Sequence, residues 1–444
     1  MLAALQNHPQ SGFARASKNA AILSTSCHKR ALASLAGDGT VFASRAREKL
    51  ERLRAELEPL ARRYDVVVAN PPYMGSGNMN KWLGGWAKEA FKDAKSDLCT
   101  CFIERGRSLA ITNGYVSMIT ASSWMFISSF EAFRKKLLAT SSICSMIQQS
   151  THGYAGVTVP TTMFVLAEDQ LGVIGSYIRL EDFDRPQWQE PKALEALANP
   201  DCGWFHRANT NDFEAIPGSP VAYWASKTMI NAFSRGKCLK EYAYGCNGIT
   251  TGDNAQFLRQ WFELSISSIG LNLDAASCLD EIDAWVPYNK GGEFQKWAAH
   301  LDYVINWNNG GADIKEFGHL VMRSKKYMLM PGYTWPKISS GHIAVRRVPK
   351  GFMFDVAGLS LFPNSKAQGL IYEALINSSV GSAFLAFLSP TLNFEVGNVT
   401  AIPILETSQY SRSIIAYAET CCELVEQCRD SFETSWRFKR HQLI

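Results

Sequence analysis

Apolar positions follow two different periods between residues 64 and 170. Short runs rich in β-branched residues alternate with longer stretches in which apolar residues recur every three or four positions, a pattern typical of strands alternating with helices. The expected strands are 66–69, 114–120, 143–149 and 161–166, and the expected helices are 97–112 and 128–139. This alternation predicts an α/β layer that binds its ligands where the strands end.

The flanking segments have other patterns. Leucines recur at helical spacing among Arg and Glu residues over 42–64, which predicts an amphipathic helix with a solvated, ion-paired face. Periodicity is lost after Glu168, and the texture then changes to aromatic, Gly and Asn residues, which indicates a separate mixed α+β domain. The predicted organisation is a helical lead-in at 1–63, the α/β layer at 64–170, a connector at 171–236, the second domain at 237–405 and a C-terminal helix within 406–444, at 414–438.

Composition narrows the class of protein only a little. The chain has 444 residues, 46% of them hydrophobic, which is enough for two or three domains with cores of their own. The net charge of +4 is only a weak argument for a polyanionic partner. The chain has no apolar run of about 18 residues, so no membrane segment is expected, and a cytoplasmic protein is predicted.

The cysteines point away from a metal centre. There are 11, an odd number, and they include no CxxC pair. The nearest approach to ligand spacing is Cys99 and Cys101, which lie in an expected helix without a second pair. We therefore expect reduced thiols and no metal site.

The most informative motif is Asn70-Pro71-Pro72-Tyr73, which follows the expected strand 66–69 directly. The proline residues fix the backbone and lack N–H groups, so the Pro71 carbonyl stays free to accept a hydrogen bond beside the side-chain oxygen of Asn70. Two such acceptors suit an amine that gives up two N–H bonds, and the Tyr73 ring offers a face for a planar group. The plain alternative is a strand followed by a structural Pro-Pro turn.

The electronics of adenine suggest a mechanism for this pocket. If Asn70 and the Pro71 carbonyl each hold one hydrogen of N6, its lone pair turns toward an incoming methyl sulfonium, and positioning supplies most of the catalysis. In duplex DNA the base must first rotate out of the stack, at a cost of a few kcal/mol. Stacking on Tyr73 offsets part of that cost, by roughly 1–3 kcal/mol.

These residues carry a family resemblance. Asn70 to Tyr73 resembles the catalytic motif of amino-group methyltransferases that use S-adenosylmethionine, and the string from Val67 to Gly75 resembles the large adenine-specific DNA methyltransferases of bacteriophage-exclusion (BREX) systems, the PglX family. The short motif also occurs in enzymes that methylate a glutamine of translation release factors or a guanine of ribosomal RNA. By the same resemblance, Asp97, Leu98 and Phe102 belong to the substrate-pocket helix, and residues 114–120 with Trp124 form the next strand and loop. Cys99 stands where related enzymes often have Tyr.

The resemblance implies S-adenosylmethionine as cofactor, but its main binding motif is missing from this chain. A glycine-rich turn should follow the first strand of such a sheet. Gly37-Asp38-Gly39 follows no expected strand, and Gly75-Ser76-Gly77 comes after the catalytic motif, so both are interpreted as turns. The predicted fold is α/β, the second half of a Rossmann-like methyltransferase sheet followed by a mixed α+β target-recognition domain, and the chain is expected to be a fragment.

The second domain also resembles the family. Residues 248–254 with Phe257 and Trp261 resemble the start of its target-recognition domain, and 372–403 resemble its end. Between them, 317–354 contains no acidic residue and seven basic ones, which fit phosphate contacts. The predicted DNA-binding residues are Arg323, Lys325, Lys326, Lys337, Arg346, Arg347 and Lys350. A solvated basic surface is the alternative.

One further group of residues bears on whether the protein is a nuclease. Asp184, Glu190 and Lys192 are arranged somewhat like the metal-binding cluster of restriction nucleases, but Pro191 interrupts them and no expected strand carries them.

Taken together, the motifs predict a site-specific methyltransferase that acts on adenine N6 in double-stranded DNA. The resemblance also implies that it marks host DNA in phage defence and that other defence subunits are its partners. The alternatives are a non-catalytic DNA-binding or interaction fragment, and a methyltransferase acting on RNA or protein glutamine.

Overall fold

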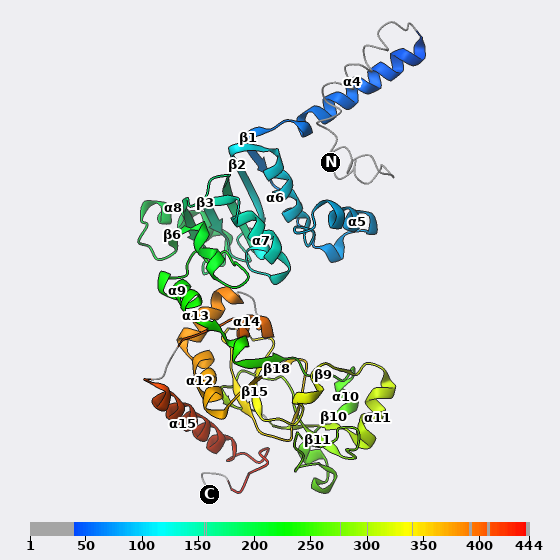
Figure 1. The fold of residues 1–444 in the computed structure, drawn as a ribbon, viewed down its shortest axis with the longest axis vertical. Helices are drawn as coiled ribbons and strands as arrows, with labels where there is room; N and C mark the ends of the chain where they lie inside the picture. The colour runs from blue at the N-terminus through cyan, green and yellow to red at the C-terminus, as the bar shows by residue number, and fades with distance from the viewer. Residues whose placement is uncertain are drawn as a thin grey trace. The chain divides into compact units, whose positions relative to one another are not determined.

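The computed structural model describes residues 40–440 except 155, 157, 276, 300, 340, 390–392 and 406–408. The expectations for residues 1–39, including the turn at Gly37 and Gly39, lie outside the described residues. The chain forms two compact units, Met1–Trp224 and Ala225–Ile444, which are described separately (Figure 1).

A six-stranded mixed sheet organises the first unit, in the order β1-β2-β4-β3-β5-β6. Strand β1 is parallel to β2, β4 is antiparallel to both β2 and β3, β5 is parallel to β3, and β6 is antiparallel to β5. The strands are β1 (Tyr64–Ala69), β2 (Ala110–Ala121), β3 (Ser141–Gln148), β4 (Thr161–Glu168), β5 (Ile174–Arg179) and β6 (Phe205–Asn209). Strands β1, β2 and β3 therefore point the same way and end at one edge of the sheet.

Helices and short 3-10 turns connect these strands. They are α4 (Val41–Ala61), η2 (Ser76–Asn78), α5 (Lys81–Ala90), α6 (Leu98–Leu109), η3 (Ser122–Met125), η4 (Ser128–Phe130), α7 (Glu131–Leu138), α8 (Pro186–Ala198) and η5 (Thr210–Ala215). Helix α6 runs along β1 and β2 (Figure 1). It approaches closely at Gly106, where an added Cβ would lie 3.3 Å from Val116 and 3.6 Å from Val67. Burial of this face against α6 forms much of the core and fixes the direction of β1.

The four strands predicted from the pattern are confirmed, and the antiparallel β4 lies between β2 and β3. The helix predicted at 97–112 ends earlier, at Leu109, because Ala110 already begins β2. Helix α4 spans nearly the predicted range and carries two i,i+4 ion pairs, Arg47 with Glu51 and Arg62 with Glu58.

The predicted connector at 171–236 is wrong for most of its length. Strands β5 and β6 lie there and extend the same sheet, and the boundary between the units falls at Trp224. The residues that place this segment in the fold are buried aromatics: Tyr177 stacks on Tyr223 with ring centroids 4.7 Å apart, and both rings are almost fully buried. Such contacts join residues far apart in the sequence, so local periodicity could not reveal them.

Two larger sheets organise the second unit, a five-stranded one in the order β12-β16-β15-β18-β8 and a four-stranded one in the order β10-β13-β11-β17. Their strands are β8 (Ala243–Cys246), β10 (Leu258–Gln260), β11 (Trp285–Asn289), β12 (Trp297–Ala298), β13 (Tyr303–Asn306), β15 (Gly332–Pro336), β16 (Arg346–Val348), β17 (Met353–Phe354) and β18 (Gly358–Pro363). Two strand pairs, β9 (Ile249–Thr250) with β14 (Val321–Met322) and β7 (Lys237–Cys238) with β19 (Pro403–Ile404), complete this mixed α+β unit.

The helices of this unit are α9 (Lys227–Arg235), α10 (Asn254–Phe257), α11 (Asn308–Phe317), α12 (Lys366–Asn377), α13 (Ser379–Leu388), α14 (Val396–Thr400) and α15 (Ser411–Arg429). Its 3-10 turns are η6 (Leu239–Glu241), η7 (Trp261–Glu263), η8 (Ile266–Ser268) and η9 (Lys325–Tyr327). None of the helices in the described part of the chain is by itself long and apolar enough to cross a membrane; α12 and α13, bent by 71°, pass that test only as a pair.

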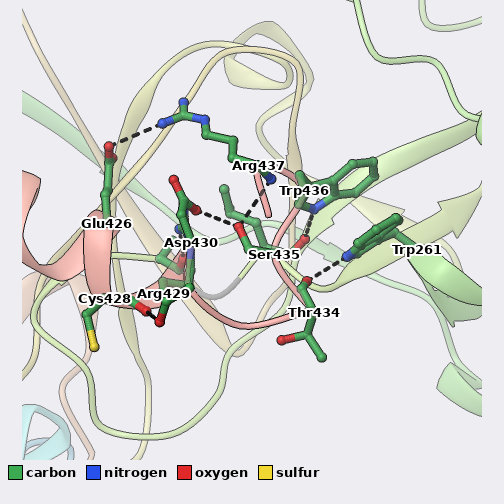
Figure 2. A network of polar contacts seen from close by, with 12 residues as sticks. Trp261, Glu426, Cys428, Arg429, Asp430, Thr434, Ser435, Trp436 and Arg437 are labelled. Atoms are coloured by element: carbon green, nitrogen blue, oxygen red, sulfur yellow. Dashed lines mark hydrogen bonds and ion pairs between the residues drawn. The ribbon is translucent and has the colours of Figure 1, made fainter. Parts of the chain in front are cut away.

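The C-terminal helix ends at Arg429, earlier than the predicted 438, because the following residues turn back onto the unit. The Trp436 ring stacks on Trp261 with centroids 4.7 Å apart, and Trp261 Nε1 donates to the Thr434 carbonyl at 2.9 Å. Ser435 Oγ donates to Asp430, which closes the turn (Figure 2). A continued helix would carry Trp436 away from these partners.

Candidate functional site

The Asn70 to Tyr73 loop begins where β1 ends, at the edge shared by the ends of β1, β2 and β3. Asn70 is exposed, Pro71 is buried and Tyr73 is 37% exposed. The loop is thus anchored by one proline, while the amide and the phenol remain accessible. That these groups receive a planar amine stays a prediction, for which both side chains are accessible.

Asp97 fixes the end of this loop against α6. Its Oδ1 accepts hydrogen bonds from the backbone N–H of Cys99 at 2.9 Å, as a helix N-cap, and from the N–H of Met74 at 3.2 Å. The Leu98 N–H in turn donates to the Met74 carbonyl at 2.9 Å. The residue that follows Tyr73 is therefore held to the first turn of α6 from both sides.

The three residues predicted to belong to the substrate-pocket helix lie in different environments. Asp97 is 9% exposed and contacts the loop, whereas Leu98 is 4% exposed and lies within the core of the unit. Phe102 packs half-buried against that core one turn further along α6. Of the three residues, the structure joins only Asp97 to the loop by a side-chain hydrogen bond.

A second phenol, that of Tyr154, lies near Tyr73 and was not predicted from the sequence as a site residue. Burial raises the pKa of Tyr73, and the nearby Cys99 and Tyr154 raise it further. Tyr154 is 40% exposed and belongs to the segment that follows β3, so it reaches the same edge as the loop after β1. Its signal in the sequence is an aromatic residue beside Gly153 just after an expected strand, which alone is too common to single out.

The segment after β2 is fixed by a buried cation. Arg134, 1% exposed on α7, donates to the carbonyls of Trp124, Ile127 and Gly218 at 2.7–3.0 Å. Burial lowers the pKa of Arg134 to about 10. Trp124, which the resemblance placed in a loop, is fully buried and donates through Nε1 to Thr120. The segment that follows β2 is thus held in place by hydrogen bonds from Arg134.

Replacing Asp97 with Ala should loosen the loop without unfolding the unit. The variant loses the helix N-cap and the bond to Met74, at a cost of about 1–2 kcal/mol. Hydrogen exchange should become faster at the amides of Met74 and Cys99. Asp97→Asn, which retains an acceptor oxygen, is the control, and unchanged exchange in Asp97→Ala would show that the loop is held by other contacts.

The seven predicted DNA-binding residues do not form one surface. The prediction is wrong for Arg346, which is 0% exposed and donates to the Glu293 carbonyl, with burial lowering its pKa to about 10. Arg347 is also engaged internally, with Nε 2.9 Å from the buried carboxylate of Glu373 and Nη2 donating to the Ala418 carbonyl. Both arginines stabilise the unit rather than face a ligand.

The five lysines and arginines that remain differ in their partners. Lys325 pairs with Asp280 at 2.8 Å and Lys337 with Glu395 at 2.9 Å, so acidic residues outside 317–354 compensate them. Of these five, Arg323, Lys326 and Lys350 are exposed and form no ion pair with the described residues. These three are the better candidates for phosphate contacts.

The three nuclease-like residues do not form one cluster: Asp184 and Lys192 line one pocket, but Glu190 is not part of its lining. Glu190 and Lys192 lie on α8 rather than on a strand, and residues two apart on a helix point away from each other. Lys192 pairs with Glu195 at 2.7 Å, while the exposed Asp184 bonds to His152 Nδ1 at 2.9 Å. The hydrogen bond from His152 lowers the pKa of Asp184. This geometry gives no support to a nuclease site.

Comparison with known proteins agrees with the sequence motifs. Residues 26–153 match the family described as Eco57I restriction-modification methylase. The chain is 38% identical over 399 residues to the adenine-specific methyltransferase PglX of Lacticaseibacillus casei (strain Zhang), and 35% identical over 395 residues to the adenine-specific methyltransferase BrxX of Escherichia coli O9:H4 (strain HS). By sequence, the chain is related to the PglX-type adenine-specific methyltransferases.

The matches cover most of this chain but only a small part of each relative. Each covers 87% of this chain, yet the chain spans only about a third of the length of either relative, 33% and 31%. Among solved structures, the Type IIL restriction-modification enzyme MmeI, determined in complex with DNA, superposes with a TM-score of 0.52 at 13% identity, over 84% of this chain and 50% of that one. The chain therefore shares its fold with part of MmeI, and the similarity to PglX and BrxX supports the family predicted from Asn70 to Tyr73.

Proposed function

We propose that this chain holds the target base in a site-specific methyltransferase that acts on adenine N6 in double-stranded DNA and marks host DNA in phage defence. The observation that carries the proposal is the accessible Asn70 at the end of β1, beside a buried proline and a half-exposed Tyr73. The PglX-type relatives are named adenine-specific methyltransferases, and MmeI is a DNA-bound enzyme, which supports the substrate.

The loop performs the positioning steps. The Asn70 side-chain oxygen and the Pro71 carbonyl each accept one N6 hydrogen of an extruded adenine, which directs the nitrogen lone pair away from the ring plane. Tyr73 stacks on the base. Asp97 keeps this geometry fixed through Met74, so the adenine meets a preorganised site.

The relationship implies S-adenosylmethionine, which supplies an electrophilic methyl group. The described residues do not fit the whole cofactor, because residues 40–69 before the catalytic loop contain no glycine and so provide no glycine-rich turn for it. The role proposed for the described residues is therefore limited to the target base and the DNA.

Removing the unpaired basic residues should weaken DNA binding in a salt-dependent way. Substituting Arg323, Lys326 and Lys350 with Gln removes three exposed charges. We expect the slope of log Kobs against log salt to fall by roughly one per charge, measured by fluorescence anisotropy on a labelled duplex. Lys366→Gln, on an exposed lysine of α12, is the control. An unchanged slope in the triple variant would show that these residues do not contact DNA phosphates.

The proposed reaction is tested in the organism that carries the gene. Deleting the gene should remove N6-methyladenine from one recurring sequence context in genomic DNA, measured by methylation-sensitive sequencing and mass spectrometry. Retention of every methylated context after deletion would contradict the proposal. DNA binding by the purified chain with no change in genomic methylation would instead favour a non-catalytic DNA-binding subunit.

A further inference from the structure

Three aromatic rings stack at the edge of the five-stranded sheet in the second unit. Tyr327 stacks on Phe362 with centroids 4.8 Å apart, and on Tyr244 with centroids 4.4 Å apart and ring planes within 13°. Tyr244 on β8 and Phe362 on β18 are directly paired across the two strands. We call these three residues the aromatic stack.

Burial decreases steadily through the stack. Phe362 is 7% exposed and packs on Phe354, so it is anchored in the core of the unit. Tyr327 is intermediate, and Tyr244 is 47% exposed. Since β8 pairs only with β18 among the described residues, the outer tyrosine stands at a sheet edge with no strand of its sheet beyond it. A large planar ring held in this way is preorganised to receive another planar group.

A lysine side chain lies beside the exposed end of the aromatic stack. Lys326 Nζ lies 4.8 Å from the centroid of Tyr327 and 5.4 Å from that of Tyr244. Lys326 and the exposed Arg323 have no ion-pair partner in the described part of the chain. By contrast, the neighbouring Lys325 is neutralised by Asp280. Of the cations without an ion pair, Lys326 is thus the one that contacts the aromatic stack.

We propose that Tyr244 is a base-stacking residue for DNA, with Lys326 contacting the adjacent phosphate. The inference rests on the proposed function and adds a specific contact to it. An exposed aromatic ring beside an ammonium without an ion pair matches a nucleotide, which offers a π-face and a phosphate a few ångströms apart. The buried base of the stack keeps the ring from folding away, so little conformational entropy is lost on binding.

Fluorescence anisotropy of the purified chain with two labelled duplexes tests this inference. One duplex is fully paired, and the other contains a central mismatch, which makes it easier to unstack a base. The wild-type chain should bind the mismatched duplex more tightly. Tyr244→Ala should bind it between about 5-fold and about 150-fold more weakly than the wild type, as expected for one stacked base.

Further variants separate stacking from folding and from charge. Tyr244→Phe keeps the ring and should bind like the wild type, whereas Tyr244→Leu keeps apolar packing on β8 and should bind like the Ala variant. Tyr417→Ala, on a tyrosine that is 73% exposed on α15, is the matched control and should have no effect. Tyr244 variants should leave the salt slope unchanged, and Lys326→Gln should reduce it by about one.

The outcomes are distinguishable from failure of the proposed function. Wild-type binding of DNA together with wild-type behaviour of Tyr244→Ala and Tyr244→Leu overturns this inference alone. A wild-type chain that binds neither duplex overturns the proposed contact with DNA and this inference with it. Loss of binding in Tyr244→Leu with an unaltered thermal unfolding midpoint supports the stacking role.

Discussion

Replacing Asn70 with Ala is expected to abolish N6-adenine methylation while leaving DNA binding intact. The variant removes one of the two acceptors proposed to hold the amine, and loss of one preorganised polar contact in an active site costs about 10²–10³-fold in rate. Because Asn70 is exposed and lies beyond the end of β1, its removal should leave the fold unchanged. The measurement is N6-methyladenine in cells whose only gene copy carries the substitution.

A neighbouring amide provides the control. Asn78 is also exposed and lies in the short turn η2 after the same loop, so Asn78→Ala should leave methylation at the wild-type level. DNA binding by both variants, measured by anisotropy, should equal that of the wild type. Methylation that persists in the Asn70→Ala strain would remove the catalytic role from the loop after β1.

Replacing Arg347 with Ala is expected to destabilise the second unit rather than weaken phosphate contacts. The buried Glu373 carboxylate, 1% exposed, would lose its cationic partner, and breaking such a pair by removing one member costs about 3 kcal/mol or more. The loss also frees the Ala418 carbonyl on α15. The check is urea unfolding followed by tryptophan fluorescence, with the exposed Arg323→Ala expected within about 0.5 kcal/mol of the wild type.

The pH dependence of this effect has a definite sign. Burial raises the pKa of Glu373 from 4.5 to about 7, partly opposed by Arg347. The folded state therefore holds the proton more tightly than the unfolded state, and stability from this group falls as pH rises from 4.5 toward 7. Without Arg347 the pKa rises further, so Arg347→Ala should cost more at pH 8 than at pH 5. In a Glu373→Gln background that difference should disappear; if it remains, another group is responsible.

The elements around the catalytic motif could be predicted because they depend on local patterns. The valines of β1 followed by two prolines specify a strand and its end, and Asp97 before Leu98 specifies a helix start. The same patterns could not show that Asp97 also bonds to Met74, 23 residues earlier, nor that Tyr154 comes close to Tyr73. Those contacts follow from the direction of β1, β2 and β3, which is a property of the whole sheet.

The surface charge of the basic segment 317–354, by contrast, could not be predicted from the sequence. A run without acidic residues was interpreted as a surface for phosphates, but the partners of Lys325, Lys337 and Arg347 come from Asp280, Glu395 and Glu373, outside the run. Arg346 occupies a strand position that faces the interior. Charge counted along the sequence thus overestimates charge available at the surface, and only the three-dimensional pairing identifies Arg323, Lys326 and Lys350.

A single oxygen atom, Asp97 Oδ1, serves both the start of α6 and the end of the catalytic loop. These two parts of the chain therefore cannot drift independently during evolution. An insertion that moved the first residue of the helix by one position would rotate the carboxylate through about 100° and release the loop, even with Asn70 to Tyr73 retained. Sequence change between 74 and 97 is consequently constrained at both ends by this oxygen, and around α5 by the burial of Leu83 and Ala87 in the core.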